Sequence, residues 1–355
     1  MATHQQQWSL KIKLDFKKLL GIKLHRTENS TLMYDDTYFT EAAMELDLHS
    51  QYQRVMSLPH NKRYLPNTQY RASKKLLSLY QSLVGSLLWG SNNWRPDGAY
   101  IVGHLARFLA NPSFEHLDAA IDVLYYFIST KEYGLLYTKS NFELQFPLRL
   151  ECITYTDSDW DKEFDHVSVS GHVMQICTPA ERNLIECTPS GDVPPLPLHN
   201  VLSWFSRKQK GHVALSTEDA ESTASVSSTT QMMWVRGLFD EFSFTSQTSP
   251  ERPWLLLCDN SATVANLHSG KISNGNQHNA RHFAYTRNEV KQCNIFPWKI
   301  DTKLNYADMM TKVLPPKEHF RHIHNIMSAY IPTAGQIAKP LHTKKHRADK
   351  QESSL

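Results

Sequence analysis

The sequence has little cysteine and no paired cysteine motif. Its five cysteines are widely spaced along the 355 residues: Cys152, Cys177, Cys187, Cys258 and Cys293. An odd number of isolated cysteines argues for reduced thiols and against a disulfide framework or a zinc ribbon. We therefore expect a cytoplasmic or nuclear protein.

Long apolar runs and a strong excess of one charge are also missing. The longest apolar stretch, around Leu83 to Trp89, is interrupted by Gly85 and Ser86 and is too short to span a membrane. Met1 to Lys13 has no apolar signal core, so we expect no membrane partner. The net charge of +3 permits an anionic partner but identifies none. What remains is ordinary globular chemistry, with length for about two domains.

The chain changes character near Leu148. Before it, Leu10–Phe16 alternates apolar and charged residues, which predicts a strand, with Leu19–Leu24 as its partner. From Gln69 to Tyr137, apolar residues recur at helical spacing, so this region is predicted to be mostly helical. After it, short strands are predicted at 152–155, 167–176, 201–205, 254–258 and 295–300. A proline-rich loop is expected at 178–200, a helix beginning near Thr217, and a final helix from about Asn305. This order predicts an α/β fold.

Four acidic residues stand at the ends of these predicted elements. Asp157 and Asp259 each follow a strand, and if those strands are parallel neighbours, both carboxylates emerge at the same edge of the sheet. Glu221 lies in the first turns of a helix, and Asp308 would project from the last helix toward that edge. Four like charges held close together need cations between them, and oxygen ligands suit Mg²⁺ best. The arrangement therefore predicts a metal site.

Each of these acids taken alone also has a purely structural interpretation. Acids at strand ends and helix starts usually form turns or N-caps. Asp159, Glu218 and Asp219 compete for the same roles, and spacing does not reject them. The basic residues that could contact phosphate, or simply form a solvated face, are Arg207, Lys208 and Lys210.

Nine short segments together resemble the C-terminal part of the Pol polyprotein of copia-type (Ty/copia) LTR retrotransposons, between about Leu10 and Phe320. The segments are Leu20-Gly21-Ile22-Lys23-Leu24, Tyr80-Gln81-Ser82-Leu83-Val84-Gly85-Ser86-Leu87, Arg95-Pro96-Asp97, Tyr133-Gly134-Leu135-Leu136, Thr156-Asp157-Ser158-Asp159-Trp160, Ser203-Trp204-Phe205-Ser206-Arg207-Lys208-Gln209, Ala214-Leu215-Ser216-Thr217, Cys258-Asp259-Asn260-Ser261-Ala262 and Ala307-Asp308-Met309-Met310-Thr311-Lys312.

The resemblance implies a particular domain organisation. Residues 1–145 would be a mainly helical remnant of the reverse transcriptase thumb and connection. Residues 146–325 would form an RNase H-like domain, a mixed five-stranded sheet with flanking helices. Residues 326–355 would be a polar, basic C-terminal tail.

The resemblance also implies an activity and its residues. The chain would be a ribonuclease H that cleaves the RNA strand of an RNA/DNA hybrid with two Mg²⁺ or Mn²⁺ ions held by Asp157, Glu221, Asp259 and Asp308. Glu221 is preferred to Glu218 and Asp219 because it precedes Ser222-Thr223-Ala224, as in the family. Arg207, Lys208, Lys210 and Asn260 would contact nucleic acid, with His282, or His278 one turn earlier, as an accessory residue.

Polymerase activity is not expected from this chain alone. Met33-Tyr34-Asp35-Asp36 mimics the metal site of a polymerase palm but lacks an intervening residue and follows Leu20-Gly21-Ile22, whereas the family's palm acids precede that motif. The partners would then be the rest of a Pol polyprotein or a separate palm subunit. The alternative is a catalytically inactive or domesticated fragment that only binds nucleic acid or protein.

Overall fold

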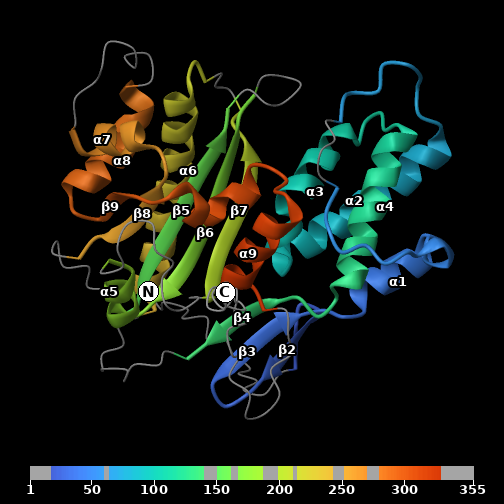
Figure 1. The fold of residues 1–355 in the computed structure, drawn as a ribbon, viewed down its shortest axis with the longest axis horizontal. Helices are drawn as coiled ribbons and strands as arrows, with labels where there is room; N and C mark the ends of the chain where they lie inside the picture. Colours follow the sequence, from blue (N-terminus) through green and yellow to red (C-terminus); the bar gives the residue numbers. More distant parts are fainter. Residues whose placement is uncertain are drawn as a thin grey trace, which may run out of the picture.

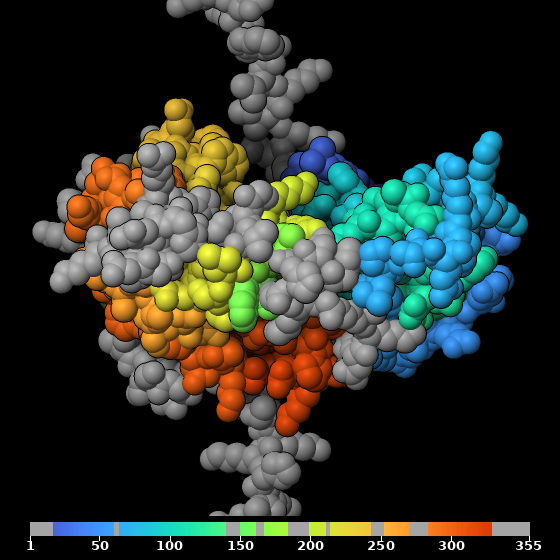
Figure 2. Space-filling view, turned by 90° about the horizontal axis from the view of Figure 1, so that it is seen from above, coloured from blue at the N-terminus to red at the C-terminus, as the bar shows by residue number. Residues whose placement is uncertain are grey.

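The computed structural model contains a helical part and a sheet part that pack side by side (Figure 1). It describes residues 17–59, 64–139, 150–160, 167–186, 199–210, 214–242, 252–269 and 280–328. Seen from above in Figure 2, the blue-to-teal N-terminal part occupies one end of the molecule and the gold-to-orange part the other. Within the described ranges, no helix combines the length and apolarity that crossing a membrane requires.

The N-terminal part combines a small sheet with a helical bundle. Its antiparallel strands, in spatial order, are β1 (Lys18–Leu19), β2 (Ile22–Arg26), β3 (Ser30–Tyr34) and β4 (Leu135–Thr138). Its helices are α1 (Tyr38–Glu45), α2 (Lys74–Asn93), α3 (Ala99–Leu105) and α4 (Phe114–Ser129), with short turns η1 (His49–Gln51), η2 (Pro96–Gly98) and η3 (Ala106–Phe108).

The prediction of one strand over Leu19–Leu24 is wrong, because this segment is divided between two strands, β1 and β2. Leu20 (φ 51°) and Gly21 (φ 88°) adopt left-handed backbone and form a turn that separates β1 from β2. The strand predicted at Leu10–Phe16 lies outside the described residues.

Helix α2 buries the apolar stripe that the sequence predicts. Ser73 caps the helix by accepting a hydrogen bond from the Leu76 amide at 3.2 Å. The stripe residues Tyr80, Leu83 and Val84 are fully buried in the core of the helical part. The stripe is therefore a packing surface, as expected.

The second half of the chain forms one mixed sheet with helices on both faces. Its strands are β5 (Glu151–Asp159), β6 (Val169–Cys177), β7 (Val201–Lys208), β8 (Trp254–Cys258) and β9 (Ile295–Lys299), in the spatial order β7-β6-β5-β8-β9. The β7-β6-β5 pairs are antiparallel, and β5-β8-β9 are parallel. The helices are α5 (Pro179–Glu186), α6 (Thr217–Glu241), α7 (Ser261–Ser269), α8 (Ala280–Lys291) and α9 (Pro316–Ile326), with turns η5 (Thr302–Leu304) and η6 (Tyr306–Met310). This mixed five-stranded sheet confirms the predicted RNase H-like fold class.

Two predicted connections are wrong. The start of the loop expected at 178–200 is the helix α5, because Pro179 suits a first helical position. The single helix expected from about Asn305 is instead η6 followed by α9. The Asn305 side chain caps η6 by accepting from the Ala307 amide, and Pro315 and Pro316 begin a new helix. Asp308 consequently lies on η6 and not on the last helix.

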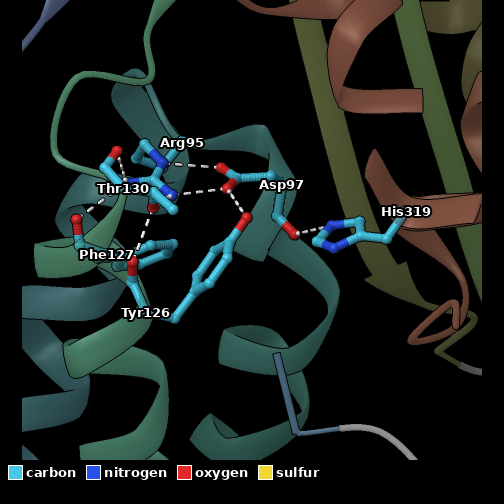
Figure 3. Close-up of polar contacts among 6 residues, drawn as sticks. All are labelled: Arg95, Asp97, Tyr126, Phe127, Thr130 and His319. Atoms are coloured by element: carbon cyan, nitrogen blue, oxygen red, sulfur yellow. Dashed lines mark hydrogen bonds and ion pairs between the residues drawn. The ribbon is translucent and has the colours of Figure 1, made fainter. Parts of the chain in front are cut away.

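Helix α9 stands between the sheet and the helical part (Figure 1). In Figure 3, the His319 ring of α9 contacts the Asp97 carbonyl oxygen (3.1 Å), while the Asp97 carboxylate pairs with the buried Arg95 guanidinium (2.7 Å). The Trp204 indole of β7 donates to the Ser91 carbonyl of α2 at 2.8 Å. The two parts of the molecule are thus joined through polar contacts.

Candidate active site

The structure brings all four predicted acids to one end of the five-stranded sheet. Carboxylate oxygens of Asp157, Asp259 and Asp308 lie within 4.8 Å of one another. Asp259 also belongs to a second group with Glu221 and Cys258. One ligand atom from each of these three residues lies within 4.8 Å of the other two. The acids come from β5, the start of α6, the residue after β8, and η6.

Strand register explains how two of these acids meet. In the parallel pair β5/β8, Thr156 is the partner of Cys258, so Asp157 and Asp259 follow side by side. Glu221 reaches this edge from the second turn of α6, where its Oε1 accepts a hydrogen bond from the Ser158 amide at 3.3 Å. Ser216 caps the same helix by accepting from the Asp219 amide.

Asp308 is positioned by contacts between η6 and strand β5. The Asn305 side-chain Nδ2 donates to the Thr156 carbonyl at 3.0 Å, and the Thr311 hydroxyl donates to the Asp157 carboxylate. Gly171 on β6 lies opposite Asp157 in the sheet, and η6 packs over it. A Cβ there would lie 2.7 Å from the Ala307 carbonyl oxygen, so only glycine allows η6 to lie this close to the sheet.

The carboxylates sit in surroundings that oppose their ionisation. Burial and the nearby Asp308 charge raise the pKa of Asp157 to about 8. Burial and the charges of Asp157 and Asp259 raise the pKa of Glu221 well above its usual range. Burial also raises the pKa of Asp308, although Lys312 opposes this shift. Like charges brought together in a buried site favour protonation unless a cation compensates them.

Lys312 is a functional candidate that sequence reasoning did not single out. Its ammonium lies 3.1 Å from Asp308 Oδ2, four residues earlier in the chain. Burial lowers the pKa of Lys312, but the charges of Asp157 and Asp308 outweigh burial and the pKa is raised. Its position in the Ala307–Lys312 motif was the feature of the sequence that could have identified it. Asn305, Gly171 and Cys258 were also missed, since only their tertiary contacts tie them to the acids.

The donor set fits divalent metal ions. Asp308 Oδ1 is buried and has no hydrogen-bond partner, which is costly for a carboxylate oxygen unless a cation binds it. Asp157, Asp259 and Asp308 offer only oxygen atoms, the ligands that Mg²⁺ and Mn²⁺ prefer. The RNase H-like fold and this acidic cluster together support a divalent cation as cofactor.

Comparison with known proteins agrees with the resemblance seen in the sequence. No protein-family model matches the chain. The chain is 26% identical over 315 residues to the retrovirus-related Pol polyprotein from transposon RE1 of Arabidopsis thaliana, covering 87% of this chain and 19% of the relative. Identity to the Pol polyprotein from transposon TNT 1-94 of Nicotiana tabacum is also 26%, over 84% of this chain and 20% of the relative. Its homologues are copia-type Pol polyproteins.

The extent of these likenesses is limited. The chain spans about a fifth of the length of these two Pol polyproteins. Among solved structures, LC11-RNase H1, isolated from compost by a metagenomic approach, is 15% identical, with a TM-score of 0.27, over 45% of this chain and 91% of that chain. The strand order β7-β6-β5-β8-β9, with β5, β8 and β9 parallel, defines the fold.

Of the predicted nucleic-acid contacts, Arg207 and Lys208 lie at the end of β7, Lys210 follows that strand, and Asn260 follows Asp259. Arg207 and Lys210 are exposed, and the Arg207 guanidinium lies 4.4 Å from the centre of the Phe205 ring. Lys208 is half-buried at the end of β7. Asn260 Oδ1 accepts a hydrogen bond from the Thr263 amide, so this side chain caps α7.

His282 falls within helix α8, and its side chain is not among the described ones. His278 lies outside the described residues.

The competing acids Glu218 and Asp219 have local structural contacts. Asp219 accepts a hydrogen bond from the Leu215 amide at 3.0 Å, and Glu218 accepts one from Asn266 of α7. Neither belongs to the two metal-compatible groups in the described chain. Asp159 is buried two residues beyond Asp157, on the same face of β5, and is absent from both groups as well.

Proposed function

We propose that this chain is a ribonuclease H that cleaves the RNA strand of RNA/DNA hybrids, with two Mg²⁺ or Mn²⁺ ions at Asp157, Glu221, Asp259 and Asp308. The observation that carries the proposal is the meeting of four acids from four distant segments at one buried edge. Like charges repel and ionised carboxylates prefer water, so packing gives these side chains no reason to meet. Retrotransposon Pol homology supports the same conclusion.

The chain's own residues would divide the work between two positions. Asp157, Asp259 and Asp308 would hold one cation, and Glu221 with Asp259 would hold the other. Bound divalent ions activate water and stabilise negative charge on the phosphate and leaving oxygen. Thr311 and Asn305 fix the orientation of Asp157 and η6, which limits the motion of the ligands. Lys312 offsets part of the negative charge at Asp308.

The hybrid would be recognised through its backbone and its 2′-hydroxyl groups. Only the RNA strand offers a 2′-hydroxyl, which is both donor and acceptor and therefore distinguishes the two strands. We propose that Arg207, Lys208 and Lys210 contact phosphates and that Asn260, next to Asp259, contacts the strand near the acids. The exposed positions of Arg207 and Lys210 support this role.

A direct assay tests the proposal. Purified protein is incubated with Mg²⁺ and a labelled RNA/DNA hybrid, duplex DNA or duplex RNA of the same sequence. We expect cleavage of the RNA strand in the hybrid alone, with 3′-hydroxyl and 5′-phosphate ends, and none in the presence of EDTA. An intact hybrid, or equal cleavage of all three duplexes, would refute the proposed function.

A further inference from the structure

One of the two metal-compatible groups contains a thiol. Cys258 is the last residue of β8 and is fully buried. Its Sγ lies 3.9 Å from Glu221 Oε2, and Asp259 completes the group. The group formed by Asp157, Asp259 and Asp308 offers oxygen atoms alone. The two positions therefore differ in chemistry, although they share Asp259.

A thiolate next to two carboxylates changes which cation binds best. Carboxylate oxygens suit Mg²⁺, whereas a thiolate is a soft ligand that favours Zn²⁺ and similar ions. Bonds from zinc to sulfur and to oxygen are about 2.3 and 2.1 Å, so one ion can join two ligand atoms up to about 4.4 Å apart. The Cys258 and Glu221 atoms fall within that limit.

A second observation points to a bound group on the same face. Thr156 is the register partner of Cys258 in the parallel pair, so both side chains stand on the face covered by α6. Its side chain is 0% exposed, and its hydroxyl oxygen has no hydrogen-bond partner. A buried hydroxyl without a partner loses its hydration and gains nothing in return. A hydrated cation or a ligand beside Cys258 and Glu221 would give this hydroxyl a partner.

The backbone also prepares the sulfur to act as a ligand. The Asn260 amide donates a hydrogen bond to Cys258 Sγ at 3.4 Å, which restrains the orientation of the side chain. Metal ligands are commonly held by such outer hydrogen bonds. A cysteine used only for packing needs no such donor.

We propose that Glu221, Cys258 and Asp259 form a binding site for a thiophilic divalent cation such as Zn²⁺, which competes there with Mg²⁺. The inference rests on the assignment of Glu221 and Asp259 as metal ligands in the proposed function, but not on nuclease activity itself. Zn²⁺ bound there would displace Mg²⁺ from the position held by Glu221 and Asp259, and the nuclease activity would be inhibited.

Cadmium is the probe for this site, because a Cd²⁺–thiolate bond produces an ultraviolet charge-transfer band. The full chain carrying Cys187→Ser and Cys293→Ser is titrated with Cd²⁺ without Mg²⁺ or nucleic acid, because Cys293 is exposed and Cys187 lies outside the described residues. We expect a saturable band whose apparent Kd rises when Mg²⁺ is added. Adding Cys258→Ser should weaken binding at least about tenfold, since even outer partners of metal ligands contribute 10–100-fold.

Two further variants keep the test decisive. Glu221→Gln retains the thiol and should also weaken Cd²⁺ binding, while Cys152→Ser, a buried cysteine in the core, should not. If Cys258→Ser fails to fold by circular dichroism, Cys258→Thr replaces it. A band that survives both Cys258→Ser and Glu221→Gln would overturn the proposal. Cd²⁺ binding that depends on Cys258, in a chain that does not cleave the hybrid, would refute the nuclease while leaving this site in place.

Discussion

At the scale of single residues, Asp157 is a buried carboxylate surrounded by other acids. Its carboxylate is buried, lies close to Asp259 and Asp308, and accepts a hydrogen bond from Thr311. A residue with only a structural role would be more stable as a neutral side chain here. An ionisable side chain is therefore retained here at a cost in stability, which is common where a site serves function.

Replacing Asp157 by asparagine should separate activity from folding. The amide keeps the size and the acceptor oxygen but removes a charge that binds cations, so hybrid cleavage should fall by more than about 100-fold. Thermal stability in EDTA should be unchanged or higher, because repulsion is relieved. Cleavage assays and thermal unfolding measure the two effects. As control, Glu218→Gln should cleave within about twofold of the parent, and full activity of Asp157→Asn would refute the assignment.

At the scale of elements, the approach of η6 to the sheet decides whether the site is complete. The turn carries Asp308, and it lies against β6 at Gly171, where a Cβ has no room. This contact joins segments more than a hundred residues apart. Local sequence around Asp308 predicted a helix, and it took the tertiary contacts of Asn305 and Thr311 to produce a short turn.

Gly171→Ala should therefore damage both stability and activity. The added methyl would lie 2.7 Å from the Ala307 carbonyl oxygen, and overpacking of this kind costs about 1–3 kcal/mol. Displacement of η6 would carry Asp308 away from Asp157, so cleavage should fall more than the loss of folded protein explains. Urea unfolding and cleavage rates provide the measurements.

The matched control is Gly85→Ala in α2. An added Cβ there meets open space, so this variant should be as stable as the parent or up to about 1 kcal/mol more stable. Equal effects of the two substitutions would argue against a special role for the η6 contact.

At the scale of the whole molecule, a buried ion pair stands where the helical part meets α9. Arg95 and Asp97 are almost fully buried, and Tyr126 donates to the same carboxylate at 2.8 Å (Figure 3). The Arg95 guanidinium also lies 4.3 Å from the centre of the Phe127 ring. Burial and the neighbouring Arg95 charge act in opposite directions on Asp97, and its pKa is lowered.

Asp97→Ala should destabilise the whole chain by about 3–5 kcal/mol, because Arg95 would be left charged and uncompensated in the interior. The free energy of unfolding in urea, followed by circular dichroism, measures this loss. Lys23→Met tests the contrast, since it removes one partner of the half-buried, solvent-accessible pair with Asp36 and should cost no more than about 1 kcal/mol. Similar losses in the two variants would contradict a central role for the buried pair.

The acidic site should also make the metal-free protein less stable as pH rises. The pKa of Asp157 is raised from 3.8 to about 8, so the folded state holds a proton that the unfolded state releases at lower pH. Stability from this group is complete below about pH 4 and is lost as pH rises toward about 8. Thermal unfolding in EDTA should show this decline, and Mg²⁺ should reduce it. Asp157→Asn should have a shallower decline, and an identical pH profile would exclude the effect.

The sequence by itself determined the fold class and named the four acids. Alternation and helical spacing specified the strands of the second half and the buried stripe of α2, because these patterns reflect which side chains avoid water. Motif likeness then selected Glu221 over Glu218 and Asp219, which spacing left open.

Only the tertiary structure decided how the acids meet and what surrounds them. The β5/β8 register, the glycine beneath η6, the Lys312 ion pair and the thiol beside Glu221 all join residues whose packing depends on distant parts of the chain. Sequence periodicity records the burial of each residue within its own element, whereas contacts between elements depend on how whole surfaces fit together. For that reason the four acids could be named from the sequence, but the contacts that position them and the thiol beside Glu221 could not.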